Sequence, residues 1–228
     1  MFDFEYRIIK KKRKSLGLYI KDGFVEARAP YWLRDQEIIA FLDSKQDWVR
    51  EQLAAQAMRQ AEAPSFEHAS QCLFFGEYRM IEHHIGKPQV LEQGNRLHVF
   101  HYAAKENKAS KHADYMAKWL RKEAEQYLRQ RTYELEIEVQ PPKAVSEVQF
   151  RKTKSKWGHC TAKGEIQLNW LLIMSPPEVM DYVIIHELCH LTHMNHSAAY
   201  WQLVEHFCPD YKDHRAWLAD HGHKISFV

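Results

Sequence analysis

The residues best suited to catalysis lie in the sequence HELCH at positions 186–190. On a helix, His186 and His190 lie one turn apart on the same face, so both imidazoles can reach a single ion through bonds of about 2.0–2.1 Å. Glu187 is rotated by about 100° from His186 and points beside that ion, where its carboxylate can take a proton from a water molecule. Apolar residues surround the motif, and buried histidine and glutamate side chains need partners. The segment therefore predicts a metal site on a buried helix.

A catalytic zinc site needs a third protein ligand and an open position for water. His193 lies on the same helix face as His186 but roughly 10 Å further along the axis. His196 can reach the ion only if the chain turns, and Asn195 suits such a turn because asparagine tolerates the left-handed conformation. The spacing HExxHxxxxxH matches that of the metzincins, although His193 occupies their glycine position. We favour His196 as the third ligand; His193 is then a residue at the rim of the site or a solvated histidine, and Glu205 is the alternative carboxylate.

The composition is that of a folded protein with little net charge. The chain has 228 residues, of which 45% are hydrophobic and 13% aromatic, enough for one large domain or two small ones. Its 32 Lys and Arg residues against 30 Asp and Glu residues give a net charge of +2, which offers no argument for binding nucleic acid or membranes through overall charge. The sequence contains no apolar stretch of the roughly 18–20 residues that a membrane span needs, no secretory signal pattern and no CxxC pair. We therefore expect a cytoplasmic protein with reduced thiols.

The segments on either side of the motif must fold around it. Hydrophobic periodicity predicts strands within residues 1–30, a helix from Asp35 to near Pro64, strands within 71–103, a helix over 113–136, strands at 146–152 and 164–173, a helix that carries the motif after Pro176 and Pro177, and two shorter C-terminal helices. A polar connector near residues 103–112 separates two parts. We predict a β-rich N-terminal part with one helix at residues 1–105 and an α+β catalytic part at residues 106–228.

The stretch from Arg151 to Leu218 resembles the YgjP-like metal-dependent hydrolases, which are distant relatives of the SprT-like zinc peptidases. That family carries the pattern WGSC…HELCHL…NHS…FW, and this chain reads WGHC, HELCHL and NHS in the same order. The resemblance implies that the three histidines at positions 186, 190 and 196 bind the metal and that Glu187 is the base. It also implies a zincin-like metallopeptidase core, in which the HExxH helix packs on a small antiparallel sheet.

One departure from the family pattern is visible, because His159 stands where a serine is usual. If that loop faces the metal, His159 could contact the substrate or bind a second ion. Arg151 and Lys154 precede the same loop. Basic residues of this kind usually form a solvated face, but in alternating strand geometry they could offer cations to a phosphate or a polyanion.

The expected cofactor is one Zn²⁺ per chain, with another divalent metal as the alternative. Bound zinc would lower the pKa of a water molecule, and Glu187 would accept its proton. A metallopeptidase acting on a peptide or protein is the favoured function. The alternative is a metal-dependent nucleoside triphosphate pyrophosphohydrolase of the UTP type, an activity also attached to this family; a metal-binding interaction module without turnover is the third hypothesis. The sequence gives no support for a nucleic-acid partner, and we expect no membrane partner.

Overall fold

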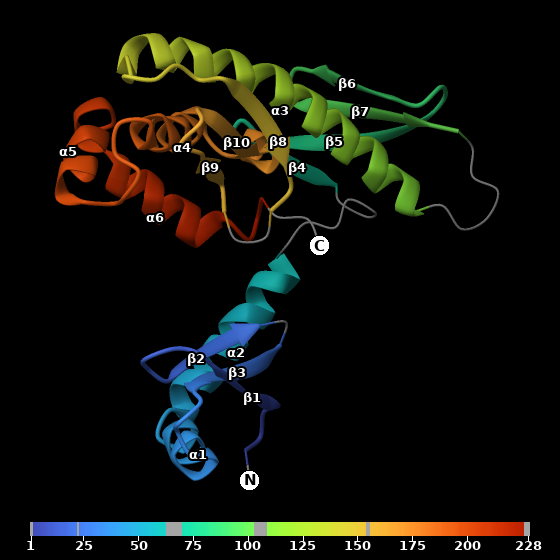
Figure 1. The fold of residues 1–228 in the computed structure, drawn as a ribbon. Helices are drawn as coiled ribbons and strands as arrows, with labels where there is room; N and C mark the ends of the chain where they lie inside the picture. Colours follow the sequence, from blue (N-terminus) through green and yellow to red (C-terminus); the bar gives the residue numbers. More distant parts are fainter. Residues whose placement is uncertain (1, 22, 63–69, 103–108, 154–155, 226–228) are drawn as a thin grey trace. The chain divides into compact units, whose positions relative to one another are not determined.

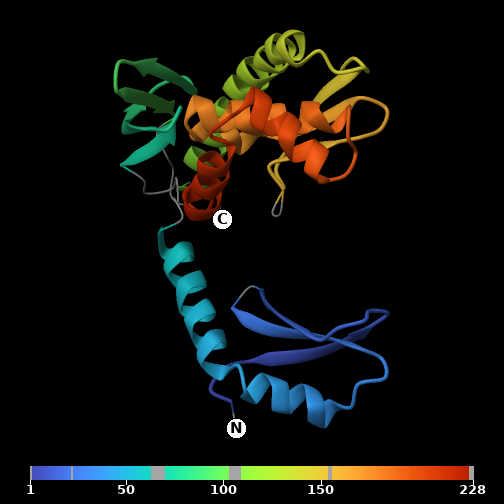
Figure 2. The ribbon, with the colours of Figure 1, turned by 90° about the vertical axis from the view of Figure 1, so that its left-hand side faces the viewer.

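The computed structural model describes residues 2–21, 23–62, 70–102, 109–153 and 156–225, and it has a mixed α+β fold (Figures 1 and 2). The chain forms two compact units, residues 1–62 and residues 63–228. This division differs from the expected one between residues 105 and 106. The reason is that the second group of strands packs on the long helix that follows it, so both belong to one unit.

The first unit is a three-stranded sheet with two helices. Its elements are β1 (Tyr6–Lys11), β2 (Gly17–Lys21), β3 (Phe24–Pro30), α1 (Asp35–Asp43) and α2 (Gln46–Glu62). The central strand β3 runs parallel to β1 and antiparallel to β2. Its buried side chains form a small core with residues of both helices: Val25, Ala27, Ala29, Ile38, Leu42 and Val49.

Two helices stand where the sequence predicted a single helix from Asp35. The hydroxyl of Ser44 donates a hydrogen bond to the carbonyl of Phe41 at 2.8 Å. The side-chain amide of Gln46 donates to the carboxylate of Asp43 at 2.7 Å. Such local hydrogen bonds from polar side chains compete with the backbone hydrogen bonds of a continuous helix. The helix therefore ends at Asp43 and a new one begins at Gln46.

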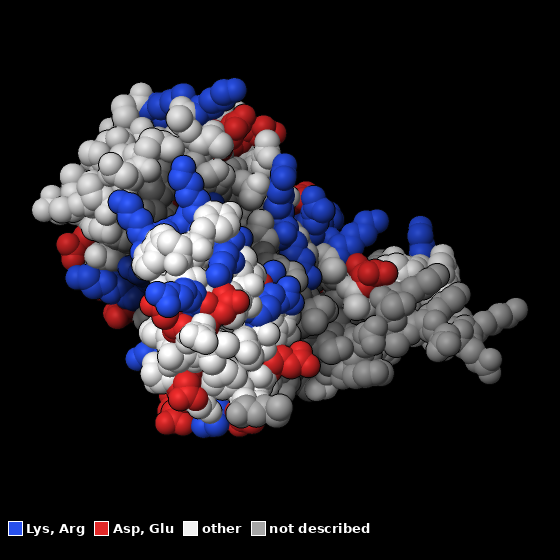
Figure 3. All heavy atoms as spheres, turned by 60° about the horizontal axis from the view of Figure 1, so that its bottom comes forward, with Lys and Arg blue, Asp and Glu red and all other residues white. Residues whose placement is uncertain are grey.

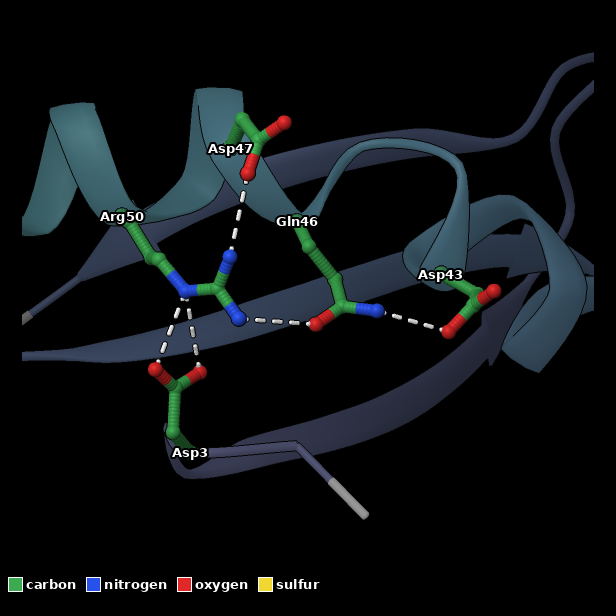
Figure 4. A network of polar contacts seen from close by, with 5 residues as sticks. All are labelled: Asp3, Asp43, Gln46, Asp47 and Arg50. Carbon is green, nitrogen blue, oxygen red and sulfur yellow. Dashed lines mark hydrogen bonds and ion pairs between the residues drawn. The ribbon is translucent and has the colours of Figure 1, made fainter.

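Arg50 ties the N-terminal segment to α2 (Figure 4). Its Nε donates to Asp3 Oδ2 at 2.9 Å, while the other guanidinium nitrogens donate to Asp47 and Gln46 at 3.0 Å each. The hydrogen bond from Arg50 lowers the pKa of the Asp3 carboxyl. The charged side chains Asp3, Asp47 and Arg50 are exposed, so the network positions the segment without adding much stability.

Among its described residues, the second unit contains two sheets, one long α-helix, three shorter α-helices and a short 3₁₀ segment. Its elements are β4 (Gln71–Phe74), β5 (Glu77–Ile85), β6 (Gln89–Gln93), β7 (Arg96–His101), α3 (Ala109–Val139), β8 (Glu147–Arg151), β9 (Gly158–Cys160), β10 (Glu165–Asn169), the 3₁₀ segment η1 (Trp170–Met174), α4 (Pro177–His190), α5 (Ala198–Phe207) and α6 (Tyr211–His221).

Helix α3 organises this unit because it contacts η1, α4, β6 and β7 (Figure 1). One face of α3 is fully buried and repeats every four residues, through Met116, Leu120, Ala124 and Leu128. Further along, Arg131 donates to both carboxylate oxygens of an aspartate in α4, at 2.8 and 2.9 Å. The apolar face of α3 and this ion pair fix α4, the helix that carries the HELCH motif.

The sheet beside α4 has the order β8-β10-β9 and is mixed, so the prediction of an antiparallel sheet was wrong. A tight turn joins β9 to β10, where Gly164 donates to the carbonyl of Thr161 at 3.0 Å, and this turn makes the two strands antiparallel. The chain also reverses between β8 and β9. Two reversals leave β10 parallel to β8. Helix α4 contacts β9 and β10.

Among the described residues, no helix is both long and apolar enough to cross a membrane. On the face drawn in Figure 3, Lys and Arg side chains lie next to Asp and Glu side chains, in agreement with the near-zero net charge. All four cysteines are free and buried.

The buried face of α3 predicts that two apolar residues of that helix contribute very differently to the free energy of unfolding. Leu120 is 0% exposed and Ile137 is 73% exposed. We expect Leu120→Ala to lower the free energy of unfolding of the second unit by about 2–5 kcal/mol, because it leaves a cavity. Ile137→Ala is the matched control and should change it by no more than about 0.5 kcal/mol. Urea denaturation followed by circular dichroism measures both; equal losses would contradict the central role of this face.

Candidate metal centre

Helix α4 is almost wholly buried, yet it carries the polar side chains of the HELCH motif. It begins at Pro177, where proline is favoured because the first helical position needs no N–H donor. Most of its residues are buried, including Glu187 and His190, and it ends at His190. The chain can therefore turn directly after the second histidine of the motif.

The turn after α4 brings a third histidine to the first two. The nitrogen donors of His186, His190 and His196 all lie within 4.8 Å of one another, and His186 Nε2 is 3.3 Å from His196 Nε2. The next residue, Ser197, caps α5 by accepting a hydrogen bond from the Tyr200 N–H at 3.3 Å. The cap fixes where α5 starts and so fixes the loop that carries His196.

These donors fit a divalent metal. Two nitrogens bound to one tetrahedral ion through bonds of about 2.0–2.1 Å are about 3.3 Å apart, which is the separation between His186 Nε2 and His196 Nε2. His190 Nδ1 donates to the carbonyl of His193 at 3.0 Å, so its Nε2 keeps a lone pair for an ion. His193 thus contributes its backbone oxygen, and its imidazole is not part of the group of donors.

Two aromatic residues of α5 hold the histidine rings in place. Tyr200 stacks on His190 with ring centroids 4.5 Å apart, and its hydroxyl donates to the carbonyl of His186 at 3.0 Å. Trp201 stacks on His196 at 5.5 Å. Tyr200 is fully buried, so these contacts restrict the orientation of the rings.

Glu187 is 4% exposed, and its burial raises its pKa to about 8, against the opposing charge of Lys156. Space for the carboxylate depends on Gly158 in β9. A Cβ atom at that position would lie 2.4 Å from Glu187 Oε1. The glycine of the WGHC sequence therefore has a structural reason, because the Glu187 carboxylate leaves no room for a side chain there.

A cavity of about 570 Å³ opens beside the histidines. Its walls include Glu187 and His159, together with two cations, Lys156 and Arg215. His159 therefore lies near the donors, as the sequence allowed. Arg151 is exposed on β8 and does not line the cavity, and Lys154 lies outside the described residues.

Arg215 was missed by the sequence analysis. It lies on α6, and its guanidinium carbon is 5.5 Å from the centroid of the Trp201 ring, which stacks on His196. Only the packing of α6 on α4 brings it to the cavity, and no local pattern in the sequence marks it.

The environment of His186 and His190 favours their neutral forms. Burial, followed by the positive charges of His190, His196 and Arg215, lowers the pKa of His186 to about 3. Burial also lowers the pKa of His190. A neutral imidazole is the form that binds a metal, so these shifts suit the proposed ligands.

The alternative ligands do not join this group. Glu205 is half exposed, and its Oε1 lies 3.6 Å from Lys212 Nζ rather than in the group of donors. Two buried cysteines near the site are not among the donors either, because burial raises the pKa values of Cys160 and Cys189 to about 12 and keeps both as thiols.

Comparison with known proteins identifies relatives of this chain. The model of the YgjP-like family, described as the YgjP-like, metallopeptidase domain, matches residues 14–221. Over 79 residues, the chain is 35% identical to a protein named UTP pyrophosphatase from Escherichia coli (strain K12), and this match covers 33% of the chain and 43% of that protein. The chain thus matches less than half of the length of this curated relative.

A solved structure is similar to part of the chain. The crystal structure of the metallopeptidase zymogen of Pyrococcus abyssi abylysin has a TM-score of 0.39 and 22% sequence identity, over 44% of this chain and 99% of that chain. A similarity at this level is too distant to locate functional residues.

The geometry of the donors predicts different effects for the two histidines after α4. We expect His196→Ala to weaken zinc binding by at least about 100-fold, because loss of a supporting partner alone weakens binding about 10–100-fold. His193→Ala keeps the backbone carbonyl that binds His190 and should leave zinc affinity near that of the wild type. Competition with a chromophoric chelator measures both affinities, and the reverse order would rule out His196 as a ligand.

Proposed function

Because the chain belongs to the YgjP-like metallopeptidase family, we propose that it is a zinc-dependent hydrolase that cleaves peptide bonds. One observation carries the proposal: three histidine donors converge within 4.8 Å beside a buried glutamate, on the wall of an open cavity. Metallopeptidases with an HExxH helix use this combination of ligands and base. A zincin-like arrangement of α4 beside the β8-β10-β9 sheet is part of the proposal.

The imidazoles of His186, His190 and His196 would hold the metal. A Zn²⁺ ion bound there supplies a Lewis acid that lowers the pKa of a water molecule to about 7 and polarises a carbonyl oxygen. The carbonyl of His193 and the ring of Tyr200 keep His190 in the orientation that presents Nε2. The chain thereby sets the positions of its ligands before any ion binds.

Glu187 is the proposed general base. Its carboxylate lines the cavity, and burial raises its pKa to about 8. A carboxylate with a pKa close to the working pH is an efficient proton acceptor, and in its protonated form it can donate the proton to a leaving amine. Gly158 leaves Glu187 room on the cavity wall.

The cavity offers surfaces for a peptide. Tyr182, Val183 and Leu218 supply an apolar part of the wall, which suits the side chain of a peptide substrate. His159 is exposed on the same wall, where its imidazole can hydrogen-bond the substrate.

A second candidate function is hydrolysis of a nucleoside triphosphate with release of pyrophosphate. The observation that favours it is the pair of cations on the cavity wall, Lys156 and Arg215, because a triphosphate needs cationic partners besides a metal. The Escherichia coli relative named UTP pyrophosphatase supports the same reaction class.

Glu187→Gln tests the proposal on a panel of unfolded proteins, peptides and nucleoside triphosphates. We expect wild type to cleave peptides, and the variant to lose about 10²–10⁴-fold in turnover because the amide cannot accept the proton. Zinc content should stay unchanged, since Glu187 is not among the donors. Release of pyrophosphate that depends on Glu187, without cleavage of any peptide, would replace the peptidase by the second candidate.

Arg215→Ala separates the two reaction classes by kinetics. For a peptidase, we expect kcat/KM on peptides to stay within a few-fold of wild type. For a pyrophosphohydrolase, the variant should raise KM for the nucleotide and make turnover less sensitive to salt. Arg121→Ala is the matched control, because Arg121 is an exposed arginine of α3 that pairs with Glu125 and does not line the cavity.

A further inference from the structure

A second group of potential metal ligands lies on the sheet β4-β5-β7-β6, away from α4. Its members are Glu82 and His84 of β5 and His98 of β7. Side chains two positions apart on a strand share a face, and the parallel register pairs Glu82 directly with His98. The three side chains therefore point to the same side of the sheet. The neighbouring residues Ile81 and Leu97 point to the opposite side, where they are buried in the core.

The donor atoms have the spacing of a metal site. His84 Nε2 is 2.9 Å from His98 Nδ1, Glu82 Oε2 is 3.4 Å from His98 Nδ1, and Glu82 Oε2 is 4.0 Å from His84 Nε2. A point equidistant from three atoms with these separations lies about 2.0 Å from each of them, which agrees with the bonds of about 2.0–2.2 Å that zinc forms with histidine and carboxylate ligands. His84 Nε2 and His98 Nδ1 are close enough to share a hydrogen bond, and small side-chain rotations that separate them toward the about 3.3 Å of a tetrahedral site let one ion contact all three.

Neighbouring side chains hold the donors in this arrangement. Arg96 pairs with the other carboxylate oxygen of Glu82, Oε1, and so leaves Oε2 directed at the imidazoles. Phe100 stacks on the ring of His84 with centroids 5.0 Å apart. The side chains of His98, Glu82 and His84 are 19%, 34% and 39% exposed, so an ion can reach the donors from solvent.

We propose that Glu82, His84 and His98 form a second zinc-binding site, independent of the histidines at α4. Two imidazoles and one carboxylate are the ligand types of zinc and similar transition metals, whereas calcium and magnesium prefer oxygen ligands alone. Binding places the remaining ring protons on His84 Nδ1 and His98 Nε2, and water completes the coordination. The ion joins β5 to β7 and stabilises this strand pair.

The second site binds zinc more weakly than the site at α4. The positive charge of Arg96 lies next to Glu82 and opposes a cation, although its side chain is 60% exposed and solvent screens much of this charge. The donors at α4 also include the buried His190, whereas none of the three donors on the sheet is buried. We expect two zinc ions per chain, of which a weak chelator removes the one on the sheet.

Zinc titration of the metal-free protein, purified without an affinity tag, tests the site by equilibrium dialysis and elemental analysis. We expect two equivalents for wild type and loss of the weaker one in His84→Ala/His98→Ala. Glu82→Gln keeps the shape of the side chain and should weaken the same equivalent. The variant His186→Ala/His190→Ala should lose the tighter equivalent and keep the weaker one, so a failure at α4 is distinguishable from a failure on the sheet.

The opposite face of the same strands supplies a matched control. His83 and His101 also lie diagonally across β5 and β7, with ring centroids 5.8 Å apart, but they belong to no group of three donors among the described residues. His83→Ala/His101→Ala should therefore keep both equivalents. A single equivalent in wild type under excess zinc, or equal losses in the two double variants, would overturn the proposal. Circular dichroism verifies that each variant is folded.

Discussion

The second unit is built around a helix that carries ionisable side chains in a position from which water is largely excluded. An uncompensated polar group in such a place opposes folding, so the surrounding elements must supply partners for α4. The loop after α4 supplies the carbonyl of His193, α5 supplies the hydroxyl of Tyr200, and α3 supplies Arg131. Each partner comes from a different element, and the need to satisfy one helix therefore helps to determine how its neighbours pack.

The sequence predicted those parts of the structure that depend on local pattern. The HELCH motif, the proline start of α4 and the four-residue repeat of α3 are all local, and each lies where it was expected. The turn that frees His196 begins earlier than the sequence predicted, because α4 already ends at His190, and Asn195 does not adopt the left-handed conformation expected of it. The geometry thereby brings together the three histidines that were singled out, while their role as ligands stays a prediction.

The features that the sequence did not predict depend on contacts between distant segments. Arg215 reaches the cavity only because α6 packs on α4. The direction of β8 depends on two reversals of the chain, and the division after residue 62 depends on the packing of the β4-β5-β7-β6 sheet on α3. The second group of potential ligands, Glu82, His84 and His98, could not be predicted for the same reason. His98 comes from another strand, and no local pattern in the sequence gives the register that pairs it with Glu82.

Gly158 and Glu187 belong to different elements, yet each limits what the other position can hold. A methyl group at 158 would occupy the space of the carboxylate, so a larger residue becomes admissible there only if the side chain at 187 shrinks. A larger residue at 158 therefore requires a change at 187, whereas a smaller residue at 187 can be accommodated while Gly158 stays. In an alignment of relatives, a chain that has lost this glycine would be the first place to look for loss of the acid–base chemistry, even where both histidines of the motif are intact.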